Sequence, residues 1–219
     1  MAELIVVRHG QASFGAGDAG SYDRLSDLGR QQAVLAGDAL RAAGWVPDRL
    51  ICGTLDRQRE TLAAMGFDGV AEEHSGWNEY DFHDLLAVRF AGAVPDPVRD
   101  DRKTHFRTLR ETILDWQAGG LVGAAETYAQ FAQRVEAARV FSTDTAAERV
   151  LVVSSGGAIG QLVAASLKAP PDQMIALNLQ IKNTSMSRFV FAGHRFFLHE
   201  FNTTPQFAGP EAAKLLTYS

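Results

Sequence analysis

The chain has 219 residues, of which 46% are hydrophobic, and its formal net charge at pH 7 is −5. A chain of this length buries roughly 70% of its unfolded surface, so one core can form without metal ions or disulfides. The acidic balance and the lack of any block of Lys and Arg argue against nucleic acid and anionic membranes as partners. We therefore predict one domain over residues 1–219.

The single cysteine, Cys52, cannot form an internal disulfide, and the first residues, MAELIVVRHG, lack the basic start and apolar stretch of a signal peptide. No apolar run approaches the roughly 20 residues of a transmembrane helix. We expect a soluble, cytoplasmic protein with no membrane partner. No histidine pair has the spacing of metal ligands, and neither GxxxxGK nor GxGxxG occurs, so we expect no metal site and no cofactor.

Three short apolar segments predict the central strands. Residues 4–7 (LIVV) and 150–153 (VLVV) are continuous apolar runs, typical of strands buried on both faces of a mainly parallel sheet. Residues 49–52 (RLIC) are a third, weaker candidate for a parallel strand, which begins after Pro47 and ends at Gly53.

Two helices are predicted between and after these strands. The first is capped by Ser26 or Asp27 and ends at Gly44, and the second runs from Leu55 to Met65. An alternation of strand and helix is the pattern of right-handed crossover units. The sequence therefore predicts an α/β fold in three layers, α/β/α, around a mainly parallel central sheet.

The rest of the chain predicts additions to this fold. From about residue 78 to 141 the pattern is helical, which predicts a helical insertion over the rim of the sheet. The glycines after the run at 150–153 open a further helix, and residues 187–192 and 195–201 alternate like an antiparallel hairpin at the sheet edge. Residues from about 205 to 219 are predicted to form a loosely held tail.

Arg8, His9 and Gly10 follow the first predicted strand. Ligands of such sheets bind outside the carboxyl ends of the strands, so position alone makes His9 a candidate. A neutral imidazole can attack a phosphoryl group, an adjacent guanidinium can hold phosphate oxygens, and glycine allows close backbone approach. The alternative is that Arg8 is a surface charge and His9 a satisfied residue at a strand end.

Two further segments lie at the same predicted edge. Arg57 follows the weaker strand and enters the second helix, so its guanidinium can converge with that of Arg8 on one anion. It could equally be an exposed residue that pairs along its own helix. Ser155 and Gly156 lie between a strand and a helix, where backbone N–H groups and the positive helix end face an anion. The glycines there could instead serve only a tight turn.

Five segments, taken in chain order, resemble the histidine phosphatase superfamily, also called the phosphoglycerate mutase-like family. They are RHG at 8–10, LSDLGRQQA at 25–33, GTLDRQRET at 53–61, WNEYD at 77–81 and VLVVSSGGAIG at 150–160. The next strand, NTSMSRF at 183–189, is also similar. RHG alone is a weak signal, whereas the ordered set covers most of the chain.

The resemblance implies a phosphomonoesterase that acts on a small phosphorylated metabolite and releases inorganic phosphate. It implies that His9 is phosphorylated, that Arg8 and Arg57 hold the phosphate, and that Glu79 protonates the leaving oxygen before water attacks the phosphohistidine. The same loop contains two alternative acids, Asp81 and Asp84. A homodimer is compatible with these features.

The sequence departs from the family pattern at two places. The last motif of the family normally has a second histidine where this chain has Ser155, although the serine hydroxyl and the Gly156 N–H remain as donors. Loss of one preorganised donor costs roughly a hundredfold to a thousandfold in rate. The family commonly has an asparagine where this chain has Gly15, and Ser13 is a candidate replacement donor. His83 is a candidate replacement for the missing imidazole.

Other functions follow from the same residues. With Ser155 in place of the second histidine, the chain could bind a phosphorylated ligand or partner with little turnover. A serine hydrolase based on Ser155 is disfavoured, because SSGG lacks the glycine that precedes serine in GxSxG. The stretch FGAGDAG at 14–20 is either a lid over the substrate or a surface loop. The segment after RHG lacks the longer pattern of the glycolytic mutases, which favours a phosphatase.

Overall fold

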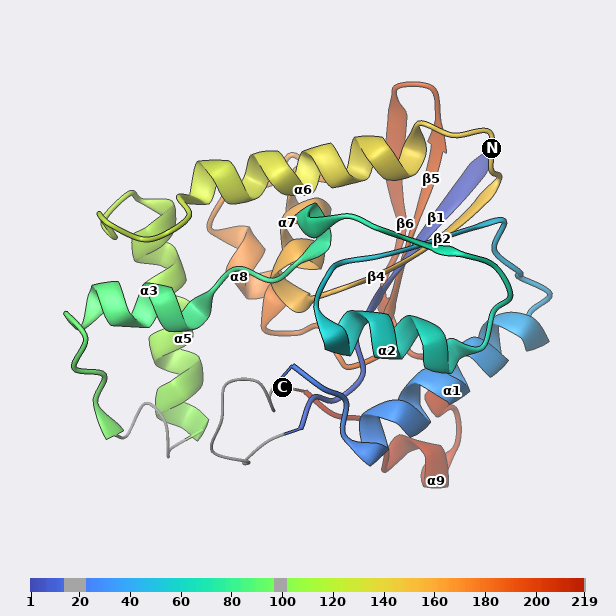
Figure 1. Ribbon diagram of the computed structural model, residues 1–219, viewed down its shortest axis with the longest axis horizontal. Coiled ribbons are helices and arrows are strands. Elements are labelled where there is room, and N and C mark those ends of the chain that lie inside the picture. Colours follow the sequence, from blue (N-terminus) through green and yellow to red (C-terminus); the bar gives the residue numbers. More distant parts are fainter. Residues whose placement is uncertain (14–22, 97–101, 219) are drawn as a thin grey trace.

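The computed structural model describes residues 1–13, 23–96 and 102–218 (Figure 1). Its strands form one six-stranded sheet in the order β3-β2-β4-β1-β5-β6. The parallel strands are β1 (Ala2–Arg8), β2 (Arg49–Cys52), β3 (Ala71–Glu73) and β4 (Arg149–Ser154). The antiparallel strands are β5 (Met186–Ala192) and β6 (Arg195–Thr203). This topology confirms the predicted α/β fold with a mainly parallel sheet and an antiparallel edge.

Helices cover both faces of the sheet (Figure 1). α1 (Asp27–Ala42) and α2 (Asp56–Met65) pack on the face that carries Ile5 and Val7. α6 (Tyr128–Thr143) and α7 (Gly156–Ser166) pack on the face that carries Leu4 and Val6. Successive strand residues point to opposite faces, and the residues of β1 from Leu4 onward are buried on both. A strand that is buried on both faces needs apolar residues at successive positions, which explains the continuous apolar runs in the sequence.

The ends of α1 and α2 follow local signals. Ser26 caps α1 by accepting a hydrogen bond from the Gly29 N–H, and Gly66 ends α2 in the left-handed conformation with φ of 69°. The two helices approach closely, since a Cβ on Gly37 would lie 2.0 Å from the Met65 carbonyl oxygen. This packing fixes α2, whose first turn lies at the carboxyl edge of the sheet.

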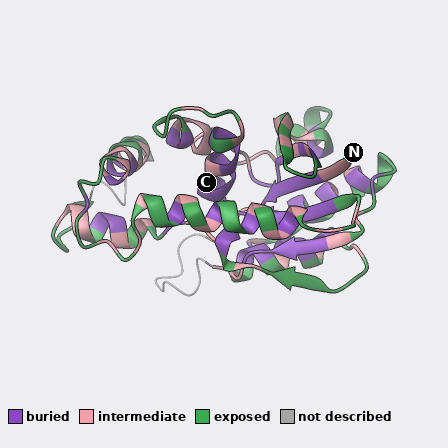
Figure 2. Cartoon of the chain, turned by 90° about the horizontal axis from the view of Figure 1, so that it is seen from above, coloured by how far each residue is buried: buried purple, intermediate pink, exposed green. Residues whose placement is uncertain are grey.

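The segment predicted as a helical insertion, about 78–141, contains α3 (Phe82–Arg89), α5 (Arg102–Gln117) and nearly all of α6, and the short η1 (Ser75–Trp77) precedes it. It does more than cover a rim, because Phe131, like Trp77 before it, is fully buried in the core beneath one sheet face. The short helix α8 (Gln173–Asn178) packs on the same side, against α7 and α5. Seen from above, the central strands are buried, a strand at the sheet edge is exposed, and the helices turn exposed faces outward (Figure 2).

The prediction of a loosely held tail was wrong for the described residues up to 218. η2 (Pro205–Phe207) and α9 (Pro210–Ala213) follow β6, and Gln206 and Phe207 are buried. Gln32 of α1 donates through Nε2 to the Leu215 carbonyl at 2.7 Å and to the Thr217 hydroxyl at 2.8 Å. Because these partners are distant in sequence, no local pattern announces them.

β3 was not predicted from the sequence, since its three residues are exposed and carry no apolar pattern. Within residues 1–13, 23–96 and 102–218, no helix has both the length and the apolarity to cross a membrane.

Candidate active site

The site lies where β1 and β4 end. Arg8 is the last residue of β1 and lies opposite Ser154, and the His9 N–H donates to the Ser154 carbonyl at 2.9 Å. Gly10 is needed for close packing, because a Cβ there would lie 2.4 Å from the Gly29 carbonyl oxygen. The carboxyl end of β1 is therefore held against both its neighbouring strand and α1.

The hydrogen bonds of the His9 ring define its tautomer. Nδ1 lies 2.8 Å from the Gly10 carbonyl oxygen, which can only accept, so Nδ1 carries the proton. Arg57 donates from Nε to His9 Nε2 at 3.2 Å, and because a guanidinium can only donate, Nε2 holds a lone pair. The ring is neutral in this arrangement.

The surroundings of His9 keep it neutral. The residue is 4% exposed, and this burial, followed by the positive charges of Arg57 and Arg8, holds the pKa of the imidazole well below its usual value. The hydrogen bond to Gly10 acts in the opposite direction but does not overcome these effects. His9 therefore presents an unprotonated ring nitrogen at neutral pH, as a nucleophile requires.

Arg57 is positioned by the first turn of α2. It is buried, and besides its bond to His9 it donates from Nη1 to the Asp23 carboxylate at 2.8 Å. The carbonyl of Arg57 accepts from the Thr61 hydroxyl at 2.7 Å, and that hydroxyl accepts from the Gly10 N–H at 3.0 Å. The turn that carries Arg57 is thus bonded directly to the loop that carries His9.

Arg8 lies beside the N-terminal end of α7. An ideal Cβ on Gly156 would be 3.6 Å from both Nε and Cζ of Arg8, which places the guanidinium against the first residue of the helix. Arg8 also donates from Nη1 to the Ile181 carbonyl. The buried guanidinium and the positive end of α7 therefore act in the same place and both favour an anion.

Glu79 reaches the same helix end from the insertion. Its Oε2 accepts from the Gly157 N–H at 2.9 Å, and its Oε1 accepts from the Tyr80 N–H at 3.2 Å. A Cβ on Gly157 would lie 2.0 Å from Glu79 Oε1. The glycine after Gly156 thus does more than make a turn, because it provides the space that this carboxylate occupies.

Ser155 precedes α7 and is fully buried. Its Oγ accepts from Gln58 Nε2 at 2.8 Å, and the same Nε2 donates to the Trp77 carbonyl at 2.9 Å. The Trp77 carbonyl also accepts from the Ser154 hydroxyl at 2.8 Å. Gln58 belongs to α2 and is itself fully buried.

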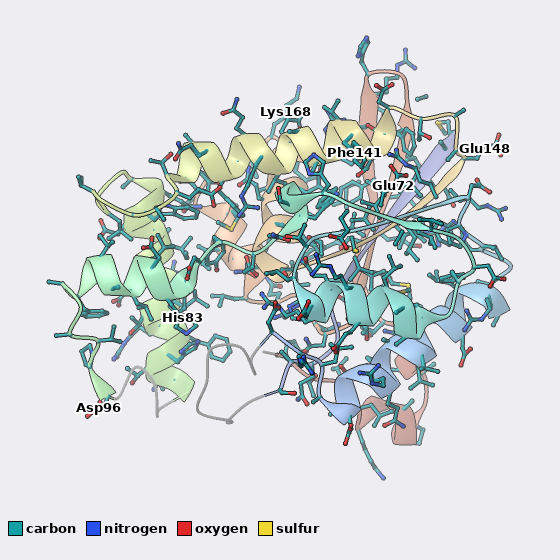
Figure 3. The ribbon with its side chains drawn as sticks, viewed as in Figure 1. Glu72, His83, Asp96, Phe141, Glu148 and Lys168 are labelled. Atoms are coloured by element: carbon teal, nitrogen blue, oxygen red, sulfur yellow. The ribbon has the colours of Figure 1, made fainter. Side chains whose placement is uncertain are left out.

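The other predicted candidates lie differently. Ser13 donates its hydroxyl to the Leu25 carbonyl at 3.2 Å, not to the residues around His9. His83 is exposed on α3 (Figure 3). Asp81 caps α3 by accepting from the Asp84 N–H, and Asp84 accepts from the Ala125 N–H at 2.8 Å. The candidate lid at 14–20, with Gly15, lies outside the described residues.

The sequence analysis missed three residues of this site. Asp23 pairs with Arg57, Gln58 bonds Ser155, and Asn183 donates from Nδ2 to the His9 carbonyl at 3.2 Å. Asp23 lies next to a segment already singled out and Gln58 lies within one, but nothing in their spacing signals burial or a partner. Gln58 stands among the polar residues that open α2 (DRQRET), so the sequence does not set it apart.

The fold and the site together define an α/β protein with a buried histidine that follows one buried arginine and bonds another at the carboxyl edge of its sheet. Residues 4–204 match the family model of the histidine phosphatase superfamily (branch 1), so the chain belongs to this superfamily.

Individual relatives extend the comparison. A 2,3-bisphosphoglycerate-dependent phosphoglycerate mutase of Parvibaculum lavamentivorans is 28% identical over 187 residues, which cover 80% of this chain and 85% of the mutase. The structure of an Entamoeba histolytica phosphoserine phosphatase variant with phosphoserine has a TM-score of 0.67 at 18% identity, over 94% of this chain and 99% of the other. A mycobacterial glucosyl-3-phosphoglycerate phosphatase with inorganic phosphate has a TM-score of 0.63 at 24% identity, over 94% and 99%. At these identities the structural likeness shows the fold.

Proposed function

We propose that this protein is a phosphomonoesterase that hydrolyses a small phosphorylated metabolite through a phosphohistidine at His9. The observation that carries the proposal is the state of His9, which is buried and neutral with its Nε2 lone pair directed at Arg57. A phosphoryl group that binds the two arginines is thereby brought to a ring nitrogen able to attack it.

The first step forms the phosphohistidine. Arg8, Arg57 and the N–H groups at the start of α7, at Gly156, bind the oxygens of the phosphoryl group and stabilise the charge that develops on them. His9 Nε2 forms a bond to phosphorus while the bond from phosphorus to the ester oxygen breaks. Glu79, in its protonated form, gives its proton to that oxygen, and the alcohol leaves.

The second step returns the enzyme to its starting state. Glu79, now a carboxylate, takes a proton from a water molecule, whose oxygen bonds to phosphorus as the bond to His9 Nε2 breaks. Inorganic phosphate leaves and Glu79 is again protonated. The same carboxyl group serves as acid and then as base, so no other proton carrier is required.

The substrate class is a phosphorylated metabolite of small size. The structural relatives support this class, since they include phosphatases of phosphoserine and of glucosyl-3-phosphoglycerate. A mutase would keep the phosphoryl group on the enzyme for return to a second hydroxyl, whereas a phosphatase loses it to water. We favour hydrolysis because the segment after RHG lacks the mutase pattern.

The test is release of inorganic phosphate from a panel of small phosphomonoesters between pH 5 and pH 8. We expect the parent to release phosphate, His9→Ala to be inactive, and His194→Ala, which changes an exposed histidine on the β5–β6 turn, to match the parent. Mass spectrometry under alkaline conditions should find the phosphoryl group on His9 during turnover. Equal rates for the parent and His9→Ala on every substrate would refute hydrolysis.

One observation favours a second candidate function. The hydroxyl of Ser155 is buried against Gln58, and the resemblance to the family's last motif implies that this serine replaces a histidine. A protein that binds a phosphorylated ligand and turns it over slowly would fit this arrangement. Binding of inorganic phosphate by the parent without measurable hydrolysis, and loss of that binding in Arg8→Ala, would favour this candidate.

A further inference from the structure

Gln58 occupies a central place beside the candidate active site. Its Oε1 accepts from the Leu55 N–H at 3.3 Å, and its Nε2 donates to the Trp77 carbonyl and to Ser155 Oγ. A Cβ on Gly53 would lie 1.9 Å from Gln58 Oε1, so the side chain is packed tightly as well as bonded. Both hydrogens of the amide nitrogen are used, and the side chain has one defined orientation.

The direction of these bonds decides what Ser155 can do. The Trp77 carbonyl can only accept, so Gln58 presents its NH₂ group to this side, and Ser155 Oγ must accept from it. The hydroxyl hydrogen of Ser155 is therefore left for another acceptor. Ser155 is fully buried next to Gly156, the residue that packs on Arg8, so such an acceptor has to come from within the site.

The same geometry excludes a larger side chain at position 155. The distance from Ser155 Oγ to Gln58 Nε2 is 2.8 Å. In the rotamer of the serine, the Cγ atom of a histidine would lie near the present Oγ, well inside the roughly 3.5 Å at which carbon contacts become favourable. The rest of the imidazole would extend further into the space that Gln58 fills.

We propose that Gln58 is a positioning residue of the phosphate site, which orients the Ser155 hydroxyl and occupies the space that an imidazole at position 155 would need. This inference rests on the proposed function, since it concerns how that site binds and transfers phosphate. It changes the expectation for a histidine placed at position 155. The substitution should restore a phosphate ligand only when Gln58 is removed with it.

The experiment compares Ser155→His, Gln58→Ala and the double variant with the parent. In Ser155→His alone, we expect the midpoint of thermal unfolding to fall by about 2 to 12 °C, the range for an overpacked core in a chain of this size, with no gain in phosphate release. In the double variant the midpoint should recover toward that of the parent. Its kcat/KM should exceed that of Gln58→Ala by up to about a hundredfold to a thousandfold, the effect of one preorganised donor.

Affinity for inorganic phosphate, measured by calorimetry, separates positioning from packing. We expect the double variant to bind phosphate at least tenfold more tightly than Gln58→Ala, whereas a purely structural role would restore the unfolding midpoint and leave this affinity unchanged. The matched control is Ser155→His with Gln161→Ala, which removes a glutamine of α7 that pairs with Tyr128. This control should rescue neither quantity.

Several outcomes would overturn the inference. Ser155→His could be as stable as the parent and gain activity by itself, or Gln58→Ala could fail to rescue it. If both histidine variants fail to fold, the unfolding free energies of Ser155→Ala, Gln58→Ala and their double variant test the inference instead. Additive losses would show that Gln58 and Ser155 are not coupled and would refute the role of their hydrogen bond. If the parent and His9→Ala release phosphate equally, the proposed function fails, while the stability and phosphate-binding measurements still judge Gln58.

Discussion

Gly157→Ala is the sharpest test of the role of Glu79. A Cβ at position 157 would lie 2.0 Å from Glu79 Oε1 and 2.3 Å from Tyr80 Cε1. An ordinary contact begins near 3.4 Å, so the carboxylate oxygen must retreat by about 1.4 Å. A misplacement of about 1 Å in a catalytic group can cost about a hundredfold, and overpacking costs about 1–3 kcal/mol of stability. We expect kcat/KM to fall about a hundredfold in a variant that still folds.

The assay is a double-mutant cycle in kcat/KM for phosphate release, with thermal unfolding measured on every variant. Glu79→Ala removes the carboxylate that the new methyl group displaces, so Gly157→Ala should add little further loss in that background. If Gly157→Ala retains the activity of the parent, the geometry around Glu79 is unimportant for catalysis. If its cost is the same with and without Glu79, the loss comes from elsewhere, such as the contact with Tyr80, and displacement of the Glu79 carboxylate is not its cause.

Three further predictions concern His9 and its supports. Because the pKa of His9 is depressed in the folded state, the unfolded state binds the proton first as the pH falls. The free energy of unfolding should therefore fall below about pH 6.5, by up to about 1.4 kcal/mol per pH unit. Urea titrations should show a shallower fall in His9→Asn, and equal slopes for the two proteins would contradict this. Arg57→Lys keeps the charge but loses the forked guanidinium that bonds both His9 and Asp23, so kcat/KM should fall about a hundredfold. The control is Arg59→Lys, which changes a partly exposed arginine paired with Glu73 and should leave kcat/KM unchanged. Asn183→Ala removes a buried donor to the His9 carbonyl and should cost about 1–3 kcal/mol in urea unfolding, and a loss below 0.5 kcal/mol would count against this support.

The elements that the sequence predicts well are those with local signals. The strand at 49–52 has the predicted bounds, and the helix from Asp27 to Ala42 begins after the predicted cap. A buried parallel strand needs a continuous apolar run, and the start of a helix needs a side chain that accepts from its first N–H groups. Both requirements are met by residues adjacent in sequence, so both can be recognised from the sequence. β3 leaves none, because its residues are exposed and its place depends on pairing with β2.

The candidate site follows the same division. The convergence of Arg57 on His9 could be anticipated, because the carboxyl ends of parallel strands meet at one edge. His9 follows β1 directly, and Arg57 lies in the first turn of the helix that follows β2. The hydrogen-bond partners within the site could not be anticipated, since Gln58 and Ser155 are 97 residues apart and Asn183 lies 174 residues from His9. A polar side chain shows its partner only after the chain has folded around it.

The antiparallel strand of the sheet has a direct consequence for this site. Because β5 runs opposite to β1, the segment that enters β5 lies at the carboxyl end of β1, where His9 is. That segment therefore supplies main-chain groups beside His9, whereas the start of a strand parallel to β1 would lie at the opposite edge of the sheet. The Ile181 carbonyl accepts from the Arg8 guanidinium, and the Ser185 carbonyl accepts from the Arg8 N–H at 3.1 Å. The bond to Ile181 holds the buried guanidinium of Arg8 beside His9, where its positive charge helps to lower the pKa of the imidazole.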